Sequence, residues 1–73
     1  MPRYEAKTDV TGSVWKIVTS VGQAIEAGDT IMIVESMKME VPVIAEEGGT
    51  IAAFLVTEGM SVAEGDAVAV VER

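Results

Sequence analysis

Short runs of apolar and β-branched residues, separated by glycines, make up most of this chain. Runs of this length and composition are typical of β-strands, and glycine suits the turns between them because it tolerates a positive φ. Residues 21–27 have some helical character, but Gly22 and Gly28 bracket them too closely for a stable helix. The pattern therefore predicts strands over residues 13–19, 30–35, 40–45, 50–57 and 67–72.

The chain contains an internal repeat, because residues 12–35 align without a gap on residues 49–72. Glycines, Gly-Asp pairs and apolar positions coincide in this alignment. The matching positions are Gly12 with Gly49, Gly22 with Gly59, Gly28-Asp29 with Gly65-Asp66, Val34-Glu35 with Val71-Glu72, Val14 with Ile51, Ile17 with Phe54, Ile25 with Val62, Ile31 with Val68, and Ile33 with Val70. Since one half cannot bury its own apolar face, the halves are expected to pack together. The predicted fold is all-β, a flattened barrel or barrel-sandwich hybrid of two antiparallel sheets with pseudo-two-fold symmetry.

Glycine and proline positions predict details of the turns and of one sheet edge. Gly28 and Gly65 should have matching positive φ values, and the aspartate after each should hydrogen-bond within its own turn. Pro42 has no N–H to contribute to a β-ladder, so its strand should lie at a sheet edge or begin there.

Alternation along the strands predicts which apolar residues point into the core. Residues two apart on a strand share a face, so one set should point inward and its alternate outward or at a sheet margin. The expected inward residues are Ile31, Ile33, Val68 and Val70, and the expected outward ones are Met32 and Ala69. Trp15 and Phe54 are the largest core candidates, although Trp15 aligns with Ala52, which is also compatible with partial exposure.

The repeat also predicts where the ends of the molecule lie. The first half ends at Glu35 and the second at Glu72, and residues 36–39 have no counterpart in the alignment. Pseudo-two-fold symmetry places these residues at one tip of a single domain, residues 1–73, and both chain termini at the other. Lys38 is therefore expected on a hairpin tip, far from either terminus.

Composition excludes several classes of function. The chain has 73 residues with a formal net charge of −7, and it contains neither cysteine nor histidine. Disulfides, thiolate-bound metals and histidine bases are therefore excluded, and no metal site is expected. The five basic residues form no stripe that nucleic acid could bind; they are Arg3, Lys7, Lys16, Lys38 and Arg73.

The sequence also lacks the features of a membrane or exported protein. No apolar run approaches the length of a membrane span. The first residues have neither the apolar core of a signal peptide nor a basic amphipathic pattern. Dispersed acidic residues keep a small domain soluble and repel nucleic acid. We therefore expect a soluble, cytoplasmic and monomeric domain.

The segment from Glu35 to Glu40, Glu-Ser-Met-Lys-Met-Glu, carries the most specific chemical signal. A lone exposed lysine is usually a solvated surface residue, and methionine often only fills gaps in a core. Here two methionines flank a lysine where a hairpin tip is normally polar, midway between two Gly-Asp half-repeats. In this respect the chain resembles, from about Asp9 to Glu72, the biotin/lipoyl attachment domains, and especially the free-standing biotin/lipoyl attachment proteins.

The resemblance implies that Lys38 is the attachment site of covalent biotin, added by biotin protein ligase. It also implies a non-catalytic biotin carboxyl carrier, which moves CO2 as carboxybiotin between biotin carboxylase and carboxyltransferase sites. The implied enzyme is an acetyl- or acyl-CoA carboxylase of fatty acid biosynthesis. Met37 and Met39 are expected to be recognised by partners, and Glu35 by the ligase. Glu35 and Glu40 also suggest paired catalytic carboxylates, but solvated charges explain them better.

Three features depart from the usual biotin domain. Ser36 stands where many have alanine, and Asp9 and Glu46 stand where many have a proline before the glycine of each half. The chain also has no room for the protruding thumb of some acetyl-CoA carboxylase carriers. These departures bear on the subfamily, because none of them changes the lysine.

Two alternative functions stay open. A lipoyl carrier has the same fold and lysine position, although typical lipoyl domains have Asp-Lys-Ala at the tip. Dual modification with biotin and lipoate is also compatible with the sequence. An unmodified β-sandwich adaptor would need no exposed lysine there. An independent enzyme is the least supported, since histidine and cysteine are absent.

Overall fold

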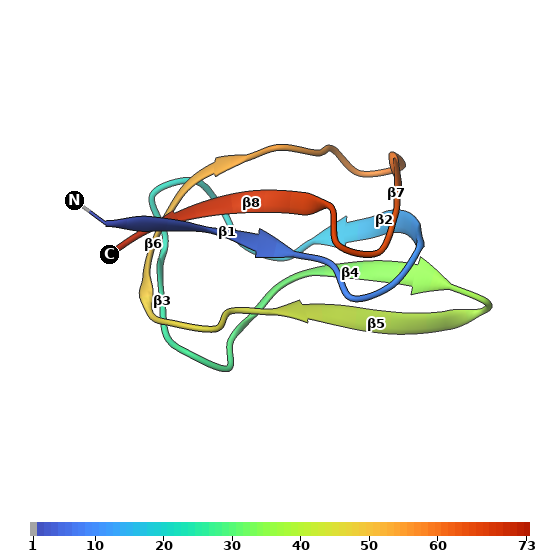
Figure 1. Cartoon of the computed structure of the whole chain (residues 1–73), viewed down its shortest axis with the longest axis horizontal. Helices are drawn as coiled ribbons and strands as arrows, with labels where there is room; N and C mark the ends of the chain where they lie inside the picture. Colours follow the sequence, from blue (N-terminus) through green and yellow to red (C-terminus); the bar gives the residue numbers. More distant parts are fainter. Residues whose placement is uncertain (1) are drawn as a thin grey trace.

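Figure 1 shows a computed structural model of the chain, which describes residues 2–73. Within this range the chain forms eight β-strands and no helix, so no helix could cross a membrane. The strands are β1 (Arg3–Lys7), β2 (Gly12–Ile17), β3 (Ala24–Ile25), β4 (Thr30–Ser36), β5 (Met39–Ile44), β6 (Gly49–Phe54), β7 (Ser61–Val62) and β8 (Ala67–Glu72). The five predicted strands are confirmed with small shifts of their ends, whereas β1, β3 and β7 were missed.

The three missed strands are short or mostly polar. β3 and β7 have two residues each, too few to show an alternating pattern. In β1 only Ala6 is buried, and charged residues stand on both sides of it. Each adopts a strand conformation by pairing with a strand distant in sequence: β1 pairs with β8, β3 with β6, and β7 with β2.

The strands form two antiparallel sheets, which confirms the predicted all-β architecture (Figure 1). One sheet has the order β1-β8-β6-β3 and the other has the order β5-β4-β2-β7. The short strand β3 comes from the first half of the repeat but pairs with β6 of the second half. Likewise β7 comes from the second half but pairs with β2 of the first half. The halves therefore interlock, since each sheet is completed by a strand from the other half.

The predicted turn and edge positions are confirmed. Gly28 and Gly65 have φ values of 94° and 89°. The aspartate after each accepts a hydrogen bond from the backbone N–H three residues before it, at 2.9 Å in the first half and 2.8 Å in the second. Pro42 lies in β5, which is an edge strand of its sheet.

The expected alternation of inward and outward residues is wrong along β4. Ile31 is buried as predicted, but Met32, expected outside, is completely buried as well, and Ile33, expected inside, is only half-buried. The reason is a β-bulge, because the register between β4 and β5 slips by one residue at Ile31. A bulge disturbs the pleat locally, so two successive residues point inward and the alternation resumes after them.

The second half requires the same correction in β8. Val68 and Ala69 are both completely buried, against the prediction that Ala69 faces outward, and Val70 is only half-buried. The bulge lies at Val68, opposite β1. Since the bulges occupy equivalent positions of the two halves, they belong to the repeated unit.

A second pair of bulges, in β2 and β6, bears on the burial of Trp15 and Phe54. Along β2 the pairing with β4 skips Trp15, and along β6 the pairing with β8 skips Ala52. Trp15 is 48% exposed and is not a core residue, whereas Phe54 is partly buried and packs against the core. The alignment of Trp15 with a small residue was thus the better indicator of its environment.

Small and medium apolar side chains from both sheets form the core. Its buried members are Ala6, Val14, Ile25, Ile31, Met32, Val34, Val43, Ala45, Ile51, Val56, Val62, Val68, Ala69 and Val71. Gly12 and Gly49 allow close approach of neighbouring strands. A Cβ atom at Gly12 would overlap the carbonyl oxygen of Glu35, and one at Gly49 would overlap that of Glu72. These contacts are again equivalent in the two halves.

The hairpin tip and the chain termini lie at opposite ends of the molecule (Figure 1). The principal extents are 36 × 18 × 18 Å. The turn between β4 and β5 stands at one end of the long axis, and both termini lie near the other end. This arrangement confirms the predicted placement of the hairpin that contains Lys38. Residue Met1 of the predicted domain lies outside the described residues.

Candidate functional site

The turn at the hairpin tip consists of two residues, Met37 and Lys38. Ser36 and Met39 form the last pair of the β4–β5 ladder, so only these two residues connect the strands. Both have a positive φ, 51° for Met37 and 67° for Lys38, as a type I′ turn requires. Such turns favour asparagine and glycine, because a positive φ is unfavourable for longer side chains. The tip therefore holds a strained backbone, at a cost on the order of 1–3 kcal/mol per residue.

Contacts below the tip hold this strained turn in place. β4 is paired on both sides, and Val34 near its end is completely buried. Ser36 Oγ donates a hydrogen bond to the carbonyl oxygen of Thr11 at 2.7 Å. Thr11 Oγ1 accepts another from the Glu64 N–H at 3.0 Å. The end of β4 next to the turn is thus fastened to the loop before β2, and that loop to the one between β7 and β8.

Thr11 and Glu64 are parts of the site that sequence reasoning missed. Their partners are far away along the chain, and a threonine or glutamate in a loop has no pattern that would reveal such a contact. From the sequence, Ser36 stands out only as a departure from the alanine of many biotin domains. The structure shows that its hydroxyl makes a specific bond to the Thr11 carbonyl.

The side chains at the tip are exposed. Met37 is 91% exposed and Met39 65%, and Lys38 is exposed between them. The ion pairs found in residues 2–73 lie at the terminal end of the molecule and do not involve Lys38. Lys7 and Lys16 lie within β1 and β2. Lys38 is therefore the one lysine of this sequence that the fold places on a hairpin tip.

Glu35 and Glu40 lie directly opposite each other on the ladder below the tip. Both are exposed, and like charges opposite each other in an antiparallel pair are unfavourable. No group of three possible metal ligands occurs in the part of the chain that the structure describes. The two carboxylates form an acidic flank of the tip.

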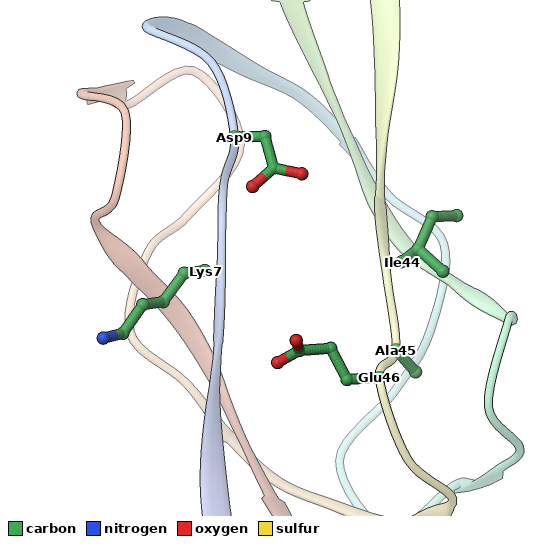
Figure 2. Close-up of a pocket in the computed structure, with 5 residues that line it drawn as sticks. All are labelled: Lys7, Asp9, Ile44, Ala45 and Glu46. Atoms are coloured by element: carbon green, nitrogen blue, oxygen red, sulfur yellow. The ribbon is translucent and has the colours of Figure 1, made fainter.

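A cavity of about 360 Å³ lies between the end of β1 and the end of β5 (Figure 2). The lining residues are Lys7, Asp9, Ile44, Ala45 and Glu46. The carboxylates of Asp9 and Glu46 point into the space between the strands, whereas the amine of Lys7 points away from it. Asp9 and Glu46 are equivalent in the repeat, so the two halves of the repeat meet at the cavity. None of the tip residues lines it, and it is separate from the candidate site.

The chain is similar to small proteins along most of its length. A family model described as "Biotin-requiring enzyme" matches residues 5–71. The chain is 40% identical over 57 residues to the biotin/lipoyl attachment protein of Bacillus subtilis (strain 168), and the match covers 78% of each chain. It is 36% identical over 67 residues to the biotinylated protein TB7.3 homolog of Mycobacterium leprae (strain TN), covering 92% of this chain and 94% of that relative.

The fold is also similar to one part of a much larger protein. The solved structure is that of the Kluyveromyces lactis urea carboxylase, with a TM-score of 0.93 and 38% sequence identity. The match covers 99% of this chain but 6% of the carboxylase chain. The similarity therefore concerns a single small domain, and the activity of the whole carboxylase does not follow from it.

Proposed function

The chain belongs to the biotin/lipoyl attachment family, and we propose that it is a biotin carrier with the cofactor joined to Lys38. The family and the cofactor rest on the similarity to biotin-requiring and biotinylated proteins. The observation that supports the site is the position of Lys38 in a two-residue turn at the hairpin tip. Exposed Met37 and Met39 flank it.

The residues at the tip fit a covalently attached carboxylic acid. A lysine amine forms an amide with such an acid, and the amide no longer carries the ammonium charge. Lys38 takes part in neither of the ion pairs found in residues 2–73, so attachment breaks no such contact. Bound to Lys38, biotin would supply a ureido nitrogen that can carry a carboxyl group between two active sites.

The shape of the domain suits delivery of the attached group into deep active sites. About ten bonds separate the lysine Cα from the ring of the cofactor, which gives a reach of roughly 13 Å. The tip stands at the end of a 36 Å axis, and the body behind it is 18 Å wide. The tip can therefore enter an active site while the body stays outside. The Ser36 bond to Thr11 fastens the end of β4, two residues before Lys38, to that body.

The proposed partners are a biotin protein ligase and the biotin carboxylase and carboxyltransferase of a biotin-dependent carboxylase. The similarity to a domain of the urea carboxylase supports this class of enzyme. We propose an acetyl- or acyl-CoA as the acceptor of the carboxyl group, and a non-catalytic role for the domain itself. Carboxylation assays with purified partner enzymes, on acyl-CoA substrates and on urea, test the choice of acceptor.

Co-expression with biotin protein ligase tests the attachment site. The intact mass should increase by one biotin per chain, and peptide mapping should locate it on Lys38. Lys38→Arg is the matched control and should take up no biotin. Biotin on Lys7 or Lys16 of the folded protein would contradict the proposal.

Lipoate is the second candidate cofactor, favoured by the similarity to a biotin/lipoyl attachment protein. Parallel co-expression with a lipoate ligase separates the possibilities by intact mass. A lipoyl carrier should gain lipoate alone, and a dual carrier should gain either group on Lys38. A chain that neither ligase modifies would be an unmodified adaptor.

The cytoplasmic location and the monomeric state stay predictions. Cell fractionation followed by detection of the biotinylated chain tests the location. Light scattering of the purified domain tests the monomeric state. A protein recovered from an exported fraction, or a mass of two chains, would contradict them.

A further inference from the structure

The four methionines within residues 2–73 have very different environments. Met37 is 91% exposed, Met39 65% and Met60 44%, whereas Met32 is completely buried. The sulfur of Met60 accepts a hydrogen bond from the Thr57 N–H at 3.2 Å, which closes the turn before β7. Among these four methionines, Met37 is therefore the most exposed, and it occupies the first position of the strained turn, directly before Lys38.

We infer that Met37 is a site of reversible oxidation that controls access of partners to Lys38. The oxidant is hydrogen peroxide. Its terminal oxygen is transferred to the Met37 sulfur, the O–O bond breaks, and water is released. The sulfur loses two electrons to the peroxide, and the product is methionine sulfoxide, which a sulfoxide reductase returns to the thioether. Met39 reacts next, while burial protects Met32.

Oxidation changes the tip without touching the core. A thioether is apolar, and a sulfoxide is polar and accepts hydrogen bonds. A partner that closes over Lys38 must bury the side chain of Met37, and burial of a polar group without a hydrogen bond is unfavourable. The sulfoxide should therefore weaken partner binding while the fold stays intact. This consequence rests on the proposed carrier function, whereas the order of oxidation does not.

Peptide mapping after timed exposure to hydrogen peroxide tests the site of oxidation. Met37 should be oxidised roughly twofold faster than Met60, in line with exposed fractions of 91% and 44%, and Met32 should stay reduced in folded protein. Oxidation of Met60 before Met37 would overturn the inference. Met37→Leu should remove the fastest phase among the methionines of residues 2–73 and leave the Met60 phase unchanged.

Biotin ligase labelling before and after peroxide treatment tests the consequence. Treated wild type should be labelled several-fold more slowly than untreated wild type, and treatment with a sulfoxide reductase should restore the rate. In the double variant Met37→Leu, Met39→Leu, the ratio of the two rates should stay at one. Met60→Leu should respond to peroxide as wild type does. Equal rates for wild type with Met37 fully oxidised would overturn the inference, whereas no labelling of untreated wild type would contradict the carrier function instead.

Discussion

The two ends of the molecule are built from equivalent strands but have opposite surface chemistry. In the alignment of the halves, the pair Glu35–Glu40 beside the tip corresponds to the pair Glu72–Arg3 beside the termini. Each pair is directly opposed on its ladder. At the terminal end the charges are opposite, and Arg3 forms an ion pair with Glu72. At the hairpin end both residues are acidic.

The terminal end is also fastened by more contacts. Arg73 forms a second ion pair with Glu47 at 2.6 Å, and its N–H donates to the Pro2 carbonyl oxygen at 2.8 Å. The Tyr4 hydroxyl donates to the Glu47 carbonyl oxygen at 2.6 Å. The hairpin end instead keeps like charges, two positive φ values and exposed methionines. Local conflicts of this kind are typical of functional sites. The contacts at the terminal end therefore stabilise the fold, whereas the hairpin end exposes Lys38 at some cost in stability.

Replacing Lys38 by arginine should have the largest effect on function. Labelling by biotin ligase should be lost completely, because the guanidinium cannot form the amide. The free energy of unfolding should change by less than about 0.5 kcal/mol, as is usual for an exposed position. Urea denaturation and intact mass measure the two effects. A large loss of stability would mean that Lys38 has a structural role at the tip.

Gly12→Ala and Gly49→Ala should lower the free energy of unfolding by similar amounts. Each new Cβ would overlap a carbonyl oxygen of the neighbouring strand, and overpacking of this kind costs about 1–3 kcal/mol. Only Gly12→Ala should slow labelling, because Gly12 lies against Glu35 in the hairpin. Denaturation curves and initial labelling rates of the two variants check this. Equal slowing by Gly49→Ala, measured where both variants are folded, would contradict it.

Ser36→Ala should loosen the hairpin alone. Loss of the bond to the Thr11 carbonyl should reduce the free energy of unfolding by about 0.5–1.5 kcal/mol. The matched control is Ser20→Ala, an exposed serine outside the hairpin, which should change stability by less than about 0.5 kcal/mol. Hydrogen exchange of the β4–β5 amides should increase in Ser36→Ala. Unchanged exchange would show that the ladder alone holds the turn.

Single charge reversals should give the opposed pair at each end the charge combination now found at the other end. Glu40→Arg copies the terminal pair and should stabilise the domain by about 0.2–1 kcal/mol, whereas Arg3→Glu should destabilise it by a similar amount. Both effects should shrink with added salt. Glu40→Arg should slow ligase labelling, and Arg3→Glu should not. Thermal denaturation and labelling rates test this, and equal labelling of both variants would remove any role for the acidic flank.

Local sequence pattern was sufficient for much of the fold and for the position of the site. Glycine turns, apolar periodicity and the repeat predicted the five main strands and the matching φ of Gly28 and Gly65. They also predicted that Lys38 lies opposite the termini. Each of these features depends on residues close together in the chain, or on the copying of one half by the other.

Only the tertiary structure decided the features that depend on strand register. The bulges at Ile31 and Trp15, and at their equivalents in the second half, set which side chains are buried. The bond from Ser36 to Thr11 joins segments distant in sequence. The apolar alternation and the turns specify register along regular strands, but a bulge shifts it by one residue at a point that depends on pairing with the partner strand. The same pairing imposes the positive φ values at Met37 and Lys38, because a turn of two residues must join two strands that are already paired.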